Sequence, residues 1–219
     1  MTRSALLLGA TGLVGGHCLD LLLADPAIAR VVTLGRRPSG RRDPKLEERV
    51  GPMDRMTDHA DAFAVSDVFC CIGTTIRAAG SREAFRRVDH DIAARAAALA
   101  SECGARHFLL VSSMGADPGS RIFYNRVKGE TEADVAALPF AGVALMRPSL
   151  LLGQRTEARA SEAVAQRVFP LLSPLMRGPL RKYRAVEART VASAMLRLAR
   201  EGVRGVRIVE SDEIERLGR

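Results

Sequence analysis

The chain has 219 residues, enough for one globular domain with a full hydrophobic core. Hydrophobic residues make up 47% and charged residues 26%, a balance typical of soluble proteins. The sequence contains no run of about 18 apolar residues, so we expect no membrane span. The net charge of +8 is carried almost entirely by arginine, while aromatic residues make up 4% and tryptophan is absent. Because so few aromatic side chains are available to stack on bases, we expect no nucleic-acid partner.

The sequence starts directly with a strand pattern and shows no secretory signal, so we expect a cytoplasmic location. The four cysteines, Cys18, Cys70, Cys71 and Cys103, show no metal-binding spacing, and the four histidines are scattered along the chain. We therefore expect buried thiols in a reducing compartment and no metal site.

The first residues predict a strand, a glycine turn and a helix. An apolar run over 4–8 leads into the sequence Gly-Ala-Thr-Gly-Leu-Val-Gly over 9–15, after which apolar residues recur at helical spacing. This context is typical of a nucleotide-binding turn. Gly9 allows unusual backbone angles, Gly12 lets the main chain approach a pyrophosphate, and Gly15 lets the helix pack close to the strand. The alternative is an ordinary strand–helix turn with surplus glycines.

A second strand, expected over 30–34, ends in Gly35-Arg36-Arg37. In dinucleotide-binding folds this strand end meets the adenosine ribose, where an acidic residue binds the 2′-hydroxyl of NAD. Two arginines stand here instead, and guanidinium matches a 2′-phosphate in charge and geometry. Arg36 and Arg37 therefore predict NADP rather than NAD, with a solvated basic loop as the alternative. Arg41 and Arg42 are weaker candidates for the same contact.

The rest of the chain alternates strands with helices. Strands are expected over 46–50, 67–72, 106–111, 143–146 and 205–209, and helices over 54–64, 82–103, 121–138, 157–169, 187–201 and 211–217. This alternation predicts a Rossmann-type α/β fold, an open and doubly wound parallel sheet. We expect a single NAD(P)-binding domain over 1–219, in which 153–219 forms a small cap on the substrate side. The apolar segment 169–180 is expected to pack in the core; a substrate wall or a partner-facing patch is the alternative.

Two of these elements carry a candidate catalytic set. Ser112-Ser113 follows the strand 106–111, and Tyr124 and Lys128 lie four residues apart on the helix 121–138, so that they share one helix face. A tyrosine hydroxyl is a weak base at neutral pH, but a neighbouring ammonium favours its phenolate. The tyrosine can then exchange a proton with a substrate oxygen that a serine orients, while hydride moves to or from the cofactor. The alternative is an ordinary surface pair of tyrosine and lysine.

These motifs together resemble the short-chain dehydrogenase/reductase superfamily in its atypical branch. More narrowly, the chain resembles the HIV Tat-interactive protein 2-like oxidoreductases in the runs 67–75, 85–91, 112–117 and 127–132 and in Arg147-Pro148. The resemblance covers nearly the whole chain and implies a Rossmann fold that binds NADP(H). In related epimerases and dehydratases the catalytic residue is the second of the serine pair, which favours Ser113 over Ser112. Arg159 falls where the family places an arginine near the cofactor and the substrate.

The expected site follows from the motifs and the resemblance. Ser113, Tyr124 and Lys128 are expected to be catalytic. The cofactor is expected to bind at Gly9, Thr11, Gly12, Leu13, Val14, Gly15, Arg36, Arg37, Gly73, Thr74, Ser112, Tyr124, Lys128 and Arg147. Two positions depart from the superfamily pattern: Gly51-Pro52 replaces an acidic residue near adenine, and Asp89 stands where many members have a catalytic asparagine.

The leading prediction is an NADPH-dependent oxidoreductase that acts on a small carbonyl or alcohol, as a monomer or homodimer. An epimerase-like reaction remains open. The alternative from another class is an NADP(H)-binding regulatory protein with little turnover that acts through a protein partner. A nucleic-acid-binding protein, suggested only by the basic composition, is a distant third.

Overall fold

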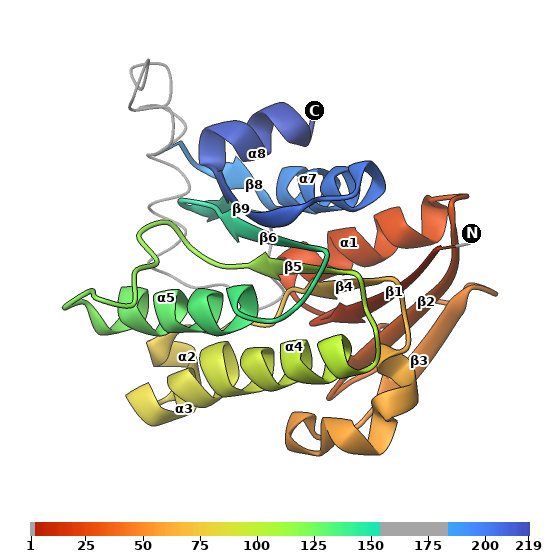
Figure 1. Cartoon of the computed structure of the whole chain (residues 1–219), viewed down its shortest axis with the longest axis horizontal. Coiled ribbons are helices and arrows are strands. Elements are labelled where there is room, and N and C mark those ends of the chain that lie inside the picture. Colours follow the sequence, from red (N-terminus) through yellow and green to blue (C-terminus); the bar gives the residue numbers. More distant parts are fainter. Residues whose placement is uncertain (1–2, 154–183) are drawn as a thin grey trace.

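Parallel strands make up the central sheet of the computed structural model, which describes residues 3–153 and 184–219 (Figure 1). Within these residues the sheet has seven strands in the order β3-β2-β1-β4-β5-β6-β9. They are β1 (Arg3–Leu8), β2 (Ile28–Gly35), β3 (Leu46–Val50), β4 (Asp67–Cys70), β5 (His107–Val111), β6 (Gly142–Arg147) and β9 (Gly205–Glu210). The short strands β7 (Leu151–Leu152) and β8 (Val186–Glu187) form a second, parallel pair that the sequence did not predict.

Helices cover both faces of the sheet (Figure 1). One face carries α1 (Leu13–Ala24), α7 (Ala188–Glu201) and α8 (Ser211–Leu217), and the other carries α4 (Ile92–Glu102), α5 (Phe123–Ala136) and the 3₁₀ helix η1 (Met53–Phe63). Successive residues of β1 supply both cores, since Ala5 and Leu7 pack toward α1 and α7 while Leu6 and Leu8 pack toward α4 and η1. The predicted doubly wound α/β fold is confirmed, with strands apolar on both faces.

The helix expected over 82–103 is confirmed in extent, but it is not an α-helix throughout. It consists of α3 (Arg82–Arg86), a π-helical turn η2 (Arg87–Asp91) that the sequence did not predict, and α4, which follow one another without a gap. The apolar spacing of this stretch does not separate an α turn from a π turn, because the side-chain contacts that accompany the π turn come from α5, more than thirty residues away. Ser81 caps the start of α3, since its Oγ accepts a hydrogen bond from the Ala84 amide at 3.0 Å.

The other expected elements differ mainly at their ends. β4 ends at Cys70 rather than at Ile72, the helix expected over 54–64 is the 3₁₀ helix η1, and the four-residue α2 (Ile76–Ala79) was not predicted. The helix expected over 157–169 and the apolar segment 169–180 lie outside the described residues. None of the described helices combines the length and apolar character needed to cross a bilayer.

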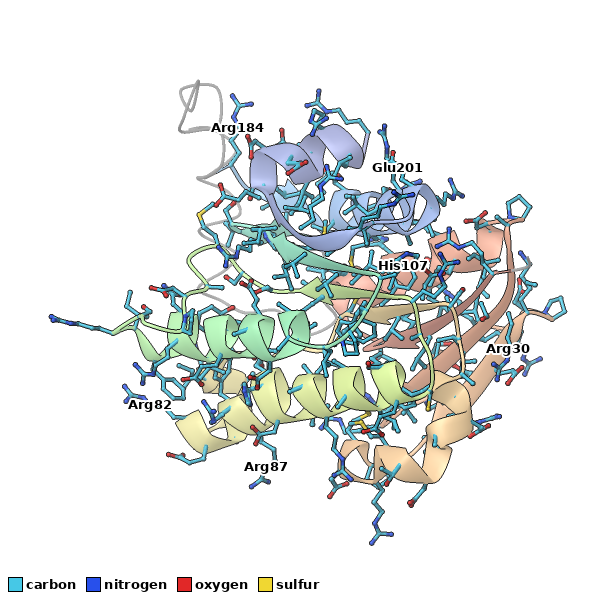
Figure 2. All side chains as sticks on the ribbon, viewed as in Figure 1. Arg30, Arg82, Arg87, His107, Arg184 and Glu201 are labelled. Carbon is cyan, nitrogen blue, oxygen red and sulfur yellow. The ribbon has the colours of Figure 1, made fainter. Side chains whose placement is uncertain are left out.

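A buried ionic cluster holds the amino-terminal edge of the sheet together. The carboxylate of Asp67, which is fully buried, lies 2.8 Å from both Arg3 Nη2 and His107 Nδ1. Burial alone would raise the pKa of Asp67, but the hydrogen bonds from His107 and Arg3 outweigh it and lower that pKa below its usual value. Figure 2 shows His107 inside the molecule, whereas Arg87 projects from the surface. This cluster joins β1, β4 and β5 at the edge opposite the predicted site.

The carboxyl ends of β1, β2, β4 and β5 lie at the other edge, and the loops that follow them carry the predicted site residues. β1 lies between β2 and β4, so the chain order reverses there. In open α/β sheets, ligands bind outside the strand ends at such a reversal. The fold therefore brings the glycine turn, the arginines after β2 and the serines after β5 to one edge.

Candidate active site

The glycine turn after β1 is a point of very close backbone contact. Gly9 has a φ of +84°, and a Cβ at this position would lie only 2.6 Å from the Cys71 carbonyl oxygen. A Cβ at Gly15 would lie 2.0 Å from the Gly9 carbonyl oxygen. Any side chain at either position would therefore push β1, β4 and α1 apart. Gly9 thus adopts the unusual backbone angle predicted for it, and Gly15 allows the predicted close packing of helix and strand.

The turn also exposes the N-terminus of α1. Gly12 is the N-cap, it supplies no side-chain cap, and the first turn of α1 holds no acidic residue. Gly12 and Thr11 are exposed, while the Val14 side chain is buried in the core and offers only its backbone to a ligand. Free amide groups and the positive end of the helix dipole suit a phosphate. This geometry fits the pyrophosphate of a dinucleotide.

Arg36 and Arg37 follow β2 on the exposed surface of the same edge. Among the described residues, neither guanidinium is engaged in an ion pair, whereas Arg41 binds Asp20 through contacts of 2.9 and 3.1 Å. The two arginines predicted to hold a 2′-phosphate are thus available to an anion, and Arg41 is engaged elsewhere. Their role as phosphate ligands stays a prediction.

The loop after β4 lies beside the predicted lysine. The Thr74 amide donates a 2.8 Å hydrogen bond to Asp89 Oδ2, while Thr75 Oγ1 caps α2 by accepting from the Ala78 amide. Gly73 is exposed, and a Cβ there would lie 3.4 Å from Asp89 Oδ1 and 3.8 Å from Lys128 Nζ. The absence of a side chain at Gly73 keeps this approach to the lysine open.

The serines after β5 differ in their surroundings. Ser112 is buried, and its Oγ has no hydrogen-bond partner among the described residues. Ser113 is more exposed, and its Oγ makes only a long contact of 3.4 Å to the Met114 carbonyl. A buried polar atom without a partner is unfavourable unless a ligand supplies one. Both hydroxyls therefore retain hydrogen-bonding capacity for a cofactor or a substrate.

Tyr124 and Lys128 lie in the first half of α5, as predicted. The Tyr124 ring packs against the buried Phe85 ring of α3, with centroids 5.3 Å apart. Lys128 is buried, and its Nζ lies 2.7 Å from Asp89 Oδ1. Burial alone would lower the pKa of Lys128, but the charge of Asp89, with a smaller contribution from Tyr124, raises that pKa above its usual value. The lysine is therefore protonated at neutral pH and lies within electrostatic reach of the tyrosine.

Two further predicted residues have other surroundings. Arg147 at the end of β6 binds Glu132 of α5, with its Nε 3.0 and 3.2 Å from the two carboxylate oxygens. This pair joins the helix to the sheet, and the expected contact of Arg147 with the cofactor stays a prediction. Arg159 lies outside the described residues.

Sequence reasoning missed three contacts that shape the site. Asp89 was noted as different from the superfamily pattern, but its pairing with Lys128 was not predicted. The contacts of Phe85 with Tyr124 and of Glu132 with Arg147 were not predicted either. All three stand in the runs that carry the family resemblance, which was the available signal. Among the described residues, no group of three or more histidine, cysteine or acidic side chains could hold a metal ion.

Known proteins resemble this chain in both sequence and structure. A family model described as NAD(P)H-binding matches residues 9–137. Protein HTATIP2 of Rattus norvegicus is 36% identical over 222 residues, which cover 99% of this chain and 90% of that protein. The mitochondrial protein fmp52 of Emericella nidulans is 38% identical over 167 residues, 73% of this chain and 72% of that protein. The predicted family resemblance is confirmed.

Solved structures support the same fold. The enzyme WbmH of Bordetella bronchiseptica, in complex with NAD+, has a TM-score of 0.71 and 14% sequence identity, and the match covers 95% of this chain and 76% of that chain. Similarity at this level of identity concerns the fold alone. It agrees with the Rossmann-type sheet described above.

The expected cytoplasmic location is wrong. The fmp52 proteins of Emericella nidulans and Debaryomyces hansenii are named mitochondrial, and these relatives point away from a purely cytoplasmic location. The expectation rested on the lack of a secretory signal pattern. Such a pattern reports on secretion and does not report on the mitochondrion, whose leader sequences have a different composition.

Replacing Gly9 tests the close-packed turn. Gly9→Ala should destabilise the chain and weaken NADPH binding more than Gly40→Ala does. Both glycines have positive φ, +84° and +74°, but a Cβ at Gly40 would meet nothing within 4 Å. Positive φ alone strains alanine by about 1–2 kcal/mol, so the excess measured for Gly9→Ala reports the contact with Cys71. Urea unfolding and thermal shift with NADPH measure the two effects, and equal losses in both variants would contradict the close contact.

Proposed function

This chain belongs to the NAD(P)H-binding family, and we propose that within it the chain is an NADPH-dependent oxidoreductase acting on a small carbonyl or alcohol. The observation that carries the proposal is the protonated, buried Lys128 within electrostatic reach of Tyr124, on one helix beside the serines that follow β5. This burial argues against an ordinary surface pair of tyrosine and lysine. A surface lysine stays in water, whereas a buried ammonium is stable only with a charged partner.

The cofactor would be held by groups at the carboxyl edge of the sheet. The amides of the first turn of α1, which follow Gly12, support binding of the pyrophosphate, and Arg36 and Arg37 would bind the 2′-phosphate. The buried Ser112 hydroxyl, which lacks a partner among the described residues, would accept or donate a hydrogen bond to the cofactor. Lys128 would also hold the nicotinamide ribose. A nicotinamide cofactor supplies or accepts a hydride in this site when it is bound.

The chain's own residues would handle the proton. Tyr124 would exchange its phenolic proton with the substrate oxygen, and Ser113 would orient that oxygen through its nearly free hydroxyl. Phe85 holds the tyrosine ring by packing against it. The sequence predicts a substrate-side cap over 153–219, but in the described part of this range β9 belongs to the central sheet and α7 and α8 pack in the layer that covers it.

The 2′-phosphate assignment has a direct test. An Arg36→Ala/Arg37→Ala double variant should lose about tenfold or more in affinity for NADPH, because charge-assisted hydrogen bonds contribute about 1.5–3 kcal/mol each. Its affinity for NADH should stay unchanged. Arg41→Ala serves as the control, since Arg41 is held by Asp20. Fluorescence titration of both nucleotides measures the affinities, and a wild-type preference for NADH would refute the assignment.

The role of Tyr124 is tested by Tyr124→Phe. This variant keeps the ring that packs on Phe85 and removes only the hydroxyl, so NADPH binding and folding should persist. NADPH oxidation in a screen of aldehydes, ketones and quinones should fall by about 10²–10⁴-fold. Unchanged activity would remove the tyrosine from the mechanism. Intact NADPH binding without turnover on any substrate by the wild-type chain would favour the regulatory alternative.

A further inference from the structure

Asp89 is a fully buried carboxylate at the centre of the candidate site. It lies on the π-helical turn η2, its Oδ1 is 2.7 Å from Lys128 Nζ, and its Oδ2 accepts the Thr74 amide at 2.8 Å. The Asp89 carbonyl also accepts a 3.0 Å hydrogen bond from Thr131 Oγ1 of α5. Single π turns inside helices occur frequently at functional sites. Here the turn presents one residue to both the lysine and the loop after β4.

The geometry gives the lysine a counter-charge that the expected chemistry does not require. A protonated lysine beside a tyrosine favours the phenolate, but a lysine paired with a carboxylate is close to neutral as a unit. Asp89 Oδ1 lies 2.7 Å from Lys128 Nζ, so the carboxylate and the ammonium are in direct ionic contact. The Asp89 charge therefore acts on Tyr124 with a sign opposite to that of Lys128.

We propose that Asp89 is a positioning residue that holds Lys128 and offsets its charge, so that Tyr124 keeps its proton at neutral pH and the site is set to donate that proton to a carbonyl oxygen. The inference rests on the proposed oxidoreductase function and gives it a direction, toward reduction. In such a reduction the carbonyl carbon gains a hydride from the reduced nicotinamide, which is oxidised, and the oxygen gains the phenolic proton. The C=O bond becomes CH–OH, and the phenolate is reprotonated from solvent.

Three ionisable groups near this pair are neutral or already paired. β4 contributes Cys70, and burial raises the pKa of its thiol to about 12, so it stays neutral. On α3, Arg86 is bound by Glu130 of α5, and on β6, Arg147 is bound by Glu132. Arg82 and Arg126 instead lie over the neighbouring Phe123 ring, 5.3 and 5.7 Å from its centroid, and every variant compared below keeps them. The variants therefore isolate the opposing charges of Lys128 and Asp89 on Tyr124.

The chain offers a clean spectroscopic test. It contains two tyrosines and no tryptophan, so a Tyr183→Phe background leaves Tyr124 as the only phenol. Its ionisation is followed by the ultraviolet absorbance of phenolate during a pH titration, without cofactor or substrate. Asp89→Asn should lower the titration midpoint by about one pH unit or more, because Asn removes the charge and can still accept the Thr74 amide. Asp91→Asn on the same turn should leave it unchanged, since Asp91 is exposed and bound to His90.

Two more variants keep the test decisive if Asp89→Asn fails to fold. Asp89→Asn leaves a buried ammonium uncompensated and can unfold the chain, so Lys128→Met and the double variant Asp89→Asn/Lys128→Met are titrated as well. Lys128→Met should raise the midpoint, and the double variant should return it near that of the parent. If removal of the Asp89 charge leaves the midpoint in place in both backgrounds, the proposal is overturned.

The titration separates this inference from the proposed function. A midpoint that shifts as expected supports the charge offset even if no carbonyl is reduced, an outcome that would contradict only the oxidoreductase assignment. With a reducible carbonyl identified, Asp89→Asn should also move the loss of kcat/KM at alkaline pH to lower pH by a similar interval. A lower kcat/KM with an unchanged pH profile would assign Asp89 a purely structural role and overturn the proposal.

Discussion

The site depends on three backbone segments that meet without side chains between them. The carbonyl oxygens of Gly9 and Cys71 occupy the positions that side chains at Gly15 and Gly9 would need. This contact seats the N-terminus of α1 against β1 and β4, where the strand order reverses. Because the helix begins there without a side-chain cap, its amides face outward at the one edge of the sheet that suits a phosphate.

The surroundings of Tyr124, at the same edge of the sheet, depend on a buried ion pair. Lys128 can be buried on α5 only because Asp89 reaches it from the π turn, and that turn is held to α5 through Thr131. Under the proposed function, the glycine turn and the ion pair would act on one cofactor from two sides. The glycine turn would hold its phosphates, and the ion pair would control the protonation of the tyrosine beside its reactive ring.

The fold and most site positions could be predicted from sequence because they depend on local patterns. Strand runs, the glycine turn and the four-residue spacing of Tyr124 and Lys128 are all read within a few residues. Contacts between distant segments could not be read in this way. The π turn interrupts a stretch with continuous helical periodicity, and the Asp89–Lys128 pair joins residues of two helices that sequence spacing does not relate. The expected location failed because it rested on the lack of a secretory signal, which does not report on the mitochondrion.

A structure with NADP+ bound tests the central claim most directly. We expect the pyrophosphate at the N-terminus of α1 beside Gly12, the 2′-phosphate at Arg36 and Arg37, and the nicotinamide ring beside Tyr124. A nucleotide bound away from the glycine turn, or a nicotinamide ring out of reach of Tyr124, would contradict this placement of the cofactor.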